Sequence, residues 1–143
     1  MAKTRATTIA DLFAIKNVND AQIAPDGSRV VYTQTVADLE NNRYISNLWM
    51  APSDGSAPPR PFTFGRQKDR APRWSPDGKR IIFLSDRSGE DRFYLIAADG
   101  GEAERLDSGK IKPGVVLWSP DGARIAFVSK PEAAEKPYDS LYV

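Results

Sequence analysis

The chain of 143 residues contains neither cysteine nor histidine. It therefore forms no disulfide, offers no thiolate to a metal, and lacks both the commonest metal ligand and the usual general base of catalysis. Its 20 basic and 19 acidic residues leave a net charge of +1, which argues against unspecific attraction to nucleic acid or anionic membranes. No apolar run is long enough to span a bilayer, and no apolar secretory segment follows the charged start at residues 1–5. We expect a cytoplasmic protein with no nucleic acid and no membrane among its partners.

What the chain does have is one phrase written three times: Ala24-Pro25-Asp26-Gly27, Ser75-Pro76-Asp77-Gly78 and Ser119-Pro120-Asp121-Gly122. Counted from Pro25 to Pro76 and on to Pro120, the spacing is 51 and then 44 residues. A repeat of this length is typical of propeller blades. Propellers close with about four to eight blades. Because 143 residues hold only about three such units, the sequence predicts an incomplete ring.

Each copy of the phrase has the residues of a type I turn between two antiparallel strands. Proline fixes φ at the second position, and glycine at the fourth tolerates the left-handed conformation. The flanking runs are short and rich in branched and aromatic residues, as strands buried between sheets are. First strands should end at Ile23, Trp74 and Trp118, with isoleucine in the tryptophan position of the first unit. The other expected strands lie after these turns, at Arg80–Leu84, Arg124–Val128, Leu48–Ala51, Phe93–Ile96, Leu141–Val143, Arg60–Phe64 and Glu104–Leu106.

The predicted fold class is all-β: a partial β-propeller of about two and a half to three four-stranded antiparallel blades, preceded by a short N-terminal helix. Residues 1–18 form the leader and residues 19–143 the incomplete propeller, with blades at about 19–66, 67–110 and 111–143. The third blade stops three residues into its third strand, so we expect a truncated chain. Between second and third strands we expect variable loops, the long polar one at Val36–Ile45, where binding tends to lie.

The leader helix is expected at Thr8–Lys16. Thr8 can cap it, with Asp11 reaching back to the free N–H groups. Three apolar residues then share one helical face: Ile9, Leu12 and Phe13. The alternative is a partly ordered tail, because a helix this short persists only when docked.

The phrase Trp-Ser-Pro-Asp-Gly, present at 74–78 and 118–122 and followed by Arg-Ile-x-Phe after one residue, resembles the propeller repeats of two groups. These are the prolyl oligopeptidase family of serine peptidases and the periplasmic Tol-system propeller. The opening at residues 8–13 and 18–27 is similar to the start of acylaminoacyl peptidases and related dipeptidyl peptidases. The resemblance covers essentially the whole chain.

The resemblance implies an α/β-hydrolase domain after the propeller, with its serine in a Gly-x-Ser-x-Gly elbow followed by aspartate and histidine. This chain has no such elbow and no histidine, so no catalytic role passes to any of its residues. We expect the N-terminal propeller fragment of a serine peptidase that hydrolyses peptides. The fragment itself would be non-catalytic, the propeller would gate substrate access, and the leader helix would pack on the hydrolase domain. The alternative is a non-catalytic binding or scaffold propeller of the Tol type.

Several side chains are candidates for a binding or metal site. The turn carboxylates are imaginable as metal ligands, but aspartate in this context bonds turn N–H groups; they are Asp26, Asp77 and Asp121. Aromatic residues at recurring positions favour packing between blades over ligand stacking; they are Trp74, Trp118, Trp49 and Tyr94. Recurring arginines are expected to reach a neighbouring turn or carboxylate; they are Arg29, Arg80 and Arg124.

Two charged segments remain as open alternatives. By resemblance to dipeptidyl peptidases, an acidic pair can grip a substrate amino terminus, either Glu102 with Glu104 or Glu90 with Asp91; a solvated turn is favoured. The segment Arg66–Arg70 is readable as a phosphate or nucleic-acid patch, although its mixed charge favours a solvated connector. We assign no catalytic, cofactor or metal residue and expect no cofactor. Expected partners are the parent's hydrolase domain, a peptide substrate, and a further copy or complementary chain on the exposed sheet edges.

Overall fold

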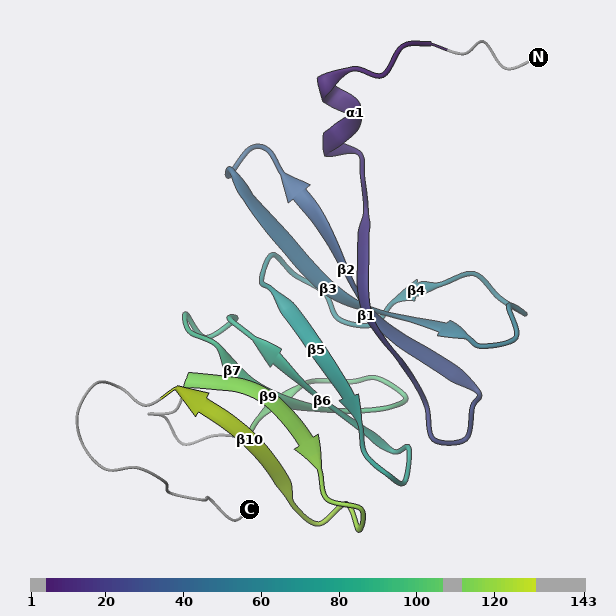
Figure 1. The fold of residues 1–143 in the computed structure, drawn as a ribbon, viewed down its shortest axis with the longest axis vertical. Helices are drawn as coiled ribbons and strands as arrows, with labels where there is room; N and C mark the ends of the chain where they lie inside the picture. Colours follow the sequence, from purple (N-terminus) through teal and green to yellow (C-terminus); the bar gives the residue numbers. More distant parts are fainter. Residues whose placement is uncertain (1–4, 107–111, 131–143) are drawn as a thin grey trace.

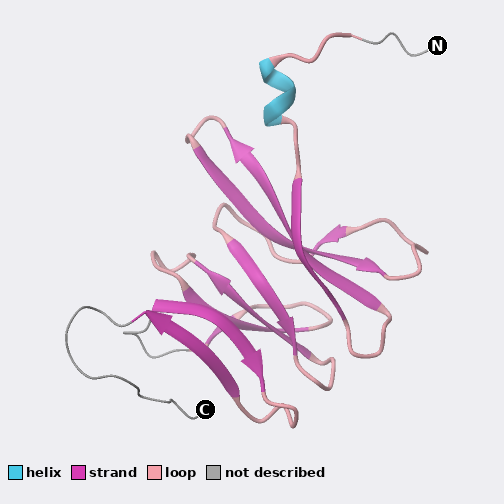
Figure 2. Cartoon of the chain, in the orientation of Figure 1, coloured by secondary structure: helices cyan, strands magenta, loops and turns pink. Residues whose placement is uncertain are grey.

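The computed structural model describes residues 5–106 and 112–130, in which one short helix precedes ten strands in three antiparallel sheets (Figures 1 and 2). The helix α1 spans Ile9–Phe13. The first sheet has the order β1-β2-β3-β4 and the second β5-β6-β7-β8, while β9 and β10 pair as a third. The strands of the first sheet are β1 Asn17–Ile23, β2 Arg29–Asp38, β3 Arg43–Pro52 and β4 Arg60–Pro61. Those that follow are β5 Asp69–Trp74, β6 Arg80–Ser85, β7 Arg92–Ala97, β8 Glu104–Arg105, β9 Lys112–Trp118 and β10 Ile125–Lys130.

The first two sheets are four-stranded meanders, the described part of the third is a hairpin, and neighbouring sheets stack face to face as adjacent blades do. The predicted all-β partial propeller is therefore confirmed. The third strand expected at Leu141–Val143 lies outside the described residues. In Figure 1 the three turns that carry the repeated phrase lie along the lower edge of the molecule. The β2–β3 hairpin, the β6–β7 loop and α1 lie toward the opposite edge, which we call the hairpin edge.

The repeated phrase folds into the same turn each time. In the second copy the Gly78 N–H donates to the Ser75 carbonyl over 2.9 Å, and the Ser75 N–H closes the hairpin on the Arg80 carbonyl over 2.8 Å. Gly78 has φ of +68°, a left-handed value that glycine adopts without strain. The Asp77 carboxylate accepts the Lys79 N–H and the Ser75 hydroxyl. The local chemistry of the phrase thus suffices to make each hairpin.

The core lies in two layers between neighbouring sheets. Because side chains alternate along a strand, one face of β6 meets the first sheet and the other face meets the third. Ile81 and Phe83 lie in the first layer with Leu48 and Met50, and Ile82 lies in the second layer with Val116 and its neighbours. The second sheet is therefore covered on both faces, which explains why Ile81–Leu84 in β6 is an unbroken apolar run.

The first strand of every sheet carries one extra residue before the turn. The pairing shifts between Asn19 and Gln22 in β1, between Arg70 and Arg73 in β5, and between residues 113 and 116 in β9. The bulges in β1 and β5 place Asp20 and Ala71 at φ of +49° and +54°. Such bulges bend the strand and re-aim its side chains. The Asp20 carboxylate is turned toward the second sheet, where the Arg73 guanidinium donates to both of its oxygens over 2.9 Å.

The junction between the first and second sheets is closed by a group of polar and aromatic contacts. The Trp74 indole N–H donates to the Gln22 carbonyl over 3.0 Å, and the Arg29 guanidinium lies 5.5 Å from the Trp74 ring centroid. Arg29 also donates to the Ala98 carbonyl over 3.0 Å. Gly78 packs close to the Pro25 ring of the preceding turn. The predictions that Trp74 packs between blades and that Arg29 reaches a neighbouring turn are confirmed.

The junction between the second and third sheets repeats these contacts. The Trp118 indole N–H donates to the Arg73 carbonyl over 3.2 Å, under an Arg80 guanidinium 5.2 Å from its ring centroid. Arg80 also donates to the Gly122 carbonyl over 3.4 Å, and Gly122 packs close to the Pro76 ring. We call this arrangement the clasp: arginine, backbone carbonyl and proline come from the earlier sheet, and tryptophan and glycine from the later one.

Three expectations differ from the structure. The segment Val36–Ile45, expected as a loop, is mostly strand, because β2 and β3 stay paired from Arg29–Pro52 to Asp38–Arg43 around a tight turn. The outer strands β4 and β8 have two residues each and are shorter than expected. The helix is shorter than Thr8–Lys16, although the Asp11 carboxylate accepts the Thr8 N–H over 2.7 Å, as expected of its cap.

Replacing Trp74 by phenylalanine keeps an aromatic ring beside Arg29 but removes the indole donor, so the Gln22 carbonyl loses its partner across the junction. We expect a loss of about 1–2 kcal/mol in the free energy of unfolding. Urea unfolding followed by circular dichroism measures it. Trp49→Phe is the matched control: Trp49 is half-buried on the outward face of the first sheet, and its loss should cost less. An equal effect of the two substitutions would contradict the role of the clasp.

Candidate functional site

The hairpin edge carries the uncovered apolar surface of the leader. No residue of α1 is buried, and Ile9, Leu12 and Phe13 are exposed on it. Leu39 and Tyr44, at the end of the β2–β3 hairpin, are exposed as well. In Figure 1 α1 lies above the tip of the β2–β3 hairpin, so both belong to the hairpin edge. Exposed apolar side chains gathered at one edge mark a surface suited to contact with another protein body.

A charged cluster at the hairpin edge of the second sheet surrounds one buried carboxylate. Asp69, at the start of β5, is 0% exposed, and one guanidinium nitrogen of Arg87 donates to both of its oxygens over 3.0 Å. The Arg87 Nε donates to the Ser85 hydroxyl over 3.0 Å. The same guanidinium lies 4.7 Å from the Tyr94 ring centroid and 5.3 Å from that of Phe83. The cluster fixes the β6–β7 loop to the first strand of its sheet.

This cluster corrects the interpretation of Arg66–Arg70 as a solvated connector. Arg66 and Lys68 are exposed, but Asp69 is buried and Arg70 is paired with Asp91. Nothing in the sequence indicates the Asp69–Arg87 pair. Asp69 lies in a segment of mixed charge, and Arg87 follows it 18 residues further along the chain.

The acidic pair of Glu90 and Asp91 is already occupied by arginines. Arg70 donates to both oxygens of Asp91, over 3.0 and 2.6 Å. Glu90 is paired with Arg92. These carboxylates are therefore not displayed as a free pair for a substrate amino group. The second pair, Glu102 and Glu104, is exposed at the outer strand of the second sheet, as a solvated turn would be.

The turn carboxylates are bound to their own turns. Asp26, Asp77 and Asp121 each accept the backbone N–H two residues on over 3.0 Å. Within the residues described, no three carboxylates gather as a metal site requires. Hydrogen bonds from the Ser75 and Ser119 hydroxyls and from turn N–H groups hold the pKa of Asp77 and Asp121 below the usual range; for Asp26 the Ser28 N–H is the main cause.

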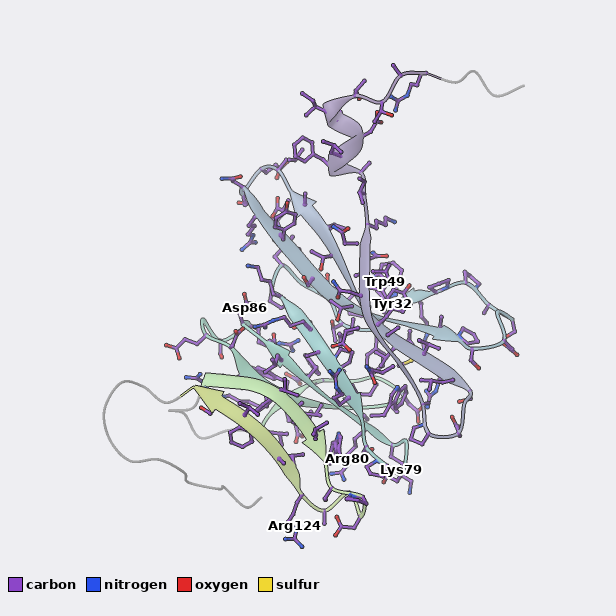
Figure 3. All side chains as sticks on the ribbon, viewed as in Figure 1. Tyr32, Trp49, Lys79, Arg80, Asp86 and Arg124 are labelled. Carbon is purple, nitrogen blue, oxygen red and sulfur yellow. The ribbon has the colours of Figure 1, made fainter. Side chains whose placement is uncertain are left out.

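Of the aromatic candidates, Tyr94 is buried in the first core layer and packs between sheets as predicted. Trp49 has the same repeat position in the first sheet, but no sheet of the described chain covers it. It pairs with Tyr32 across β2 and β3, and in Figure 3 the two residues are labelled next to each other, Trp49 above Tyr32. Burial raises the pKa of the Tyr32 phenol.

A groove of about 420 Å³ separates the outer strand of the first sheet from the β7–β8 turn. It is lined by Arg60, Phe62, Phe64 and Glu102, among other residues. Phe64 is exposed there, and the charges are of both signs. The residues that line this groove do not form a recognisable catalytic, metal-binding or ligand-binding group.

The only helix in the described part of the chain has five residues, far fewer than the roughly 20 that a membrane crossing needs.

Residues 3–137 match the PD40 family, described as the TolB beta propeller domain. The chain belongs to this family. The repeated turn, the four-stranded meanders and the stacked sheets are the structural counterpart of that match.

Known relatives include peptidases. The chain is 41% identical over 102 residues, 69% of its length, to the uncharacterized peptidase YuxL of Bacillus subtilis. It is 30% identical over 95 residues, 66% of its length, to dipeptidyl-peptidase 5 of Porphyromonas endodontalis. Among solved structures, an acylaminoacyl peptidase in complex with Z-Gly-Gly-Phe-chloromethyl ketone superposes with a TM-score of 0.70 at 19% identity, over 90% of this chain and 20% of that one. The chain is thus a propeller domain related to peptidases and also to TolB.

The chain spans 15% and 14% of the lengths of these two curated relatives. The relatives therefore carry most of their residues outside the part that corresponds to this domain.

Arg87→Ala should destabilise the second sheet, because it leaves the buried Asp69 carboxylate without its cation. We expect a loss of about 3 kcal/mol in the free energy of unfolding, measured by urea titration. The double variant Arg87→Ala with Asp69→Asn should recover part of this loss, since the unpaired charge is gone. The exposed Arg66→Ala is the control, and a loss of the same size there would refute the assignment.

The depressed pKa values of the turn aspartates predict a pH dependence of stability. A carboxylate whose pKa is lower when folded stabilises the fold above its unfolded pKa of about 3.9, and this contribution is lost as pH falls through the folded value. The variant with Asp26→Asn, Asp77→Asn and Asp121→Asn should therefore lose less stability than the wild type between pH 5 and pH 2. Urea unfolding at each pH measures the difference, and parallel curves would contradict it.

Proposed function

We propose that this chain is the N-terminal propeller part of a serine peptidase of the acylaminoacyl or dipeptidyl type. The observation that carries the proposal is the 41% identity to a peptidase over 69% of the chain. The parent hydrolyses peptides through an acyl-enzyme formed on the serine of a separate α/β-hydrolase domain. The propeller limits access to that site, and the chain itself has no hydrolytic activity. We place the parent in the cytoplasm.

In this proposal the hairpin edge faces the hydrolase domain. At the turn edge, each turn closes on its own hydrogen bonds, and the two clasps join neighbouring turns. The exposed apolar face of α1 needs a partner, because a helix of five residues has too few internal hydrogen bonds to persist alone. Docking on the hydrolase domain supplies that partner and explains why Leu12 and Phe13 are apolar.

A second candidate is a non-catalytic binding or scaffold propeller of the Tol type. It is favoured by the family description, which names TolB. The reading frame beyond Val143 separates the two. A Gly-x-Ser-x-Gly elbow followed by aspartate and histidine selects the peptidase, whereas further blades followed by a stop codon select the scaffold.

Leu12→Ser with Phe13→Ser, introduced into the full-length parent, should lower the hydrolysis of a fluorogenic peptide severalfold by loosening the leader from its partner. Neither residue belongs to the described core, so the propeller should stay folded, as circular dichroism can verify. Lys16→Ser, an exposed polar change in the same leader, is the control. Hydrolysis by the isolated 143-residue chain after extensive purification, or full activity of the double variant, would count against the proposal.

A further inference from the structure

The segment that joins the first sheet to the second is tied to both of them. Residues 64–68 lie between β4 and β5, and we call them the connector loop. The Ser46 N–H of β3 donates to the Gln67 carbonyl over 3.2 Å, and the Lys68 N–H donates to the Asp86 carboxylate over 2.7 Å. Because Asp86 begins the β6–β7 loop, the connector loop lies at the hairpin edge.

The Gln67 side chain holds the connector loop together from within. Its amide nitrogen donates to the Phe64 carbonyl over 2.6 Å and to the buried Asp69 carboxylate over 3.0 Å. Gly65 has φ of +122°, and a Cβ at this position would collide with the Gln67 amide. Asp69 is fixed in turn by Arg87. The connector loop is therefore preorganised by bonds to its own backbone, to both sheets and to the buried carboxylate.

Three side chains of this fixed loop point their functional groups into solvent. Phe64 is 74% exposed, and Arg66 and Lys68 are exposed as well. Among the described residues, neither cation forms a side-chain hydrogen bond or an ion pair. Asp38 is close enough for the charge of Arg66 to act on it, but its carboxylate is bound to the Asn41 amide over 2.9 and 3.1 Å. The fold thus fixes the backbone of the loop without engaging these three side chains.

Two cations and an aromatic ring on one fixed loop suit a particular kind of partner. Arginine and lysine bind carboxylates through charge-assisted hydrogen bonds, and an exposed ring packs against an apolar side chain. A preorganised loop loses little conformational freedom on binding, so these contacts contribute more to affinity. A stable interface between folded proteins buries about 800 Å² on each partner, far more than a loop this short provides. The connector loop therefore suits a short acidic peptide segment better than a second domain.

We propose that the connector loop binds an acidic segment of the peptide substrate. Arg66 and Lys68 pair with carboxylates of the substrate, and Phe64 packs against an apolar side chain between them. The inference rests on the proposed function for the origin of the segment, and it adds the class of substrate: peptides that carry acidic residues. Because the loop lies at the hairpin edge, a peptide bound there is on the side that the proposed function assigns to the hydrolase domain.

Direct binding to the 143-residue chain tests the inference without a catalytic step. The probe is a fluorescein-labelled peptide of sequence Ala-Glu-Phe-Glu-Ala, and its matched control has glutamine in place of both glutamates. We expect the Kd of the acidic peptide to be about fivefold lower than that of the control, since two exposed ion pairs are added. High salt should remove this difference, because it screens exposed charges. Fluorescence anisotropy measures both Kd values.

Matched variants assign the preference to the connector loop. Arg66→Ala with Lys68→Ala should raise the Kd of the acidic peptide to that of the glutamine peptide, with the fold verified by circular dichroism. Lys79→Ala with Arg124→Ala removes the same charge from exposed residues that Figure 3 labels at the lower edge of the molecule, and it should leave the preference unchanged. The inference is overturned if the wild type binds the two peptides equally, or if both double variants have the same effect.

Kinetics of the full-length parent separate this inference from the proposed function. With a fluorogenic leaving group on the same two peptides, Arg66→Ala with Lys68→Ala should lower kcat/KM about fivefold for the acidic peptide and leave it unchanged for the glutamine peptide. Equal losses for both peptides would indicate a structural role of the two cations and overturn the inference. A parent that hydrolyses neither peptide contradicts the proposed function, whereas the anisotropy result still decides whether the connector loop binds acidic peptides.

Discussion

The structure depends on a type of hydrogen bond that recurs at both junctions, from a tryptophan indole to a backbone carbonyl in the first strand of the sheet before it. Apolar burial holds two sheets together but is not directional, so by itself it leaves them free to slide or rotate. A donor with a fixed direction, inserted from one sheet into the backbone of the next, sets their relative position. The guanidinium over the indole ring adds a cation–π attraction at each junction.

The repeated phrase serves this junction as much as it serves the turn. Its tryptophan belongs to the junction with the preceding sheet, while its proline and the arginine that follows belong to the junction with the next one. The tight turn brings these groups to fixed places because its aspartate and serine tie the backbone locally. The repeated phrase therefore specifies three things with a few adjacent residues: its own turn, the contact with the preceding sheet and the contact with the next sheet.

This dual role explains which features were predictable. The turns, the strands beside them and the packing of Trp74 and Trp118 follow from local chemistry repeated at similar spacing, so the sequence predicted them. The β2–β3 hairpin was missed because Val36–Ile45 is polar and belongs to a strand pair that extends beyond the core, where no apolar alternation is required. The Asp69–Arg87 pair was missed because burial of an aspartate is decided by the fold around it, and neither residue type nor spacing reveals that.

The turn edge and the hairpin edge therefore differ in how much of their surface is available to bind another protein. At the turn edge, the aspartates of the phrase are bound to their own turns and the tryptophans to the sheet before them, so a change at these residues acts first on assembly. At the hairpin edge, the strand pair β2–β3 extends beyond the core and Arg87 fixes the β6–β7 loop to the first strand of its sheet. The leader presents an exposed apolar face there. Loops that project from a rigid sheet scaffold can change in shape and sequence without destabilising the fold, so binding surfaces tend to lie on such loops. The functional contacts of this domain are therefore to be sought at the hairpin edge, while the repeated phrase keeps the blades in register beneath it.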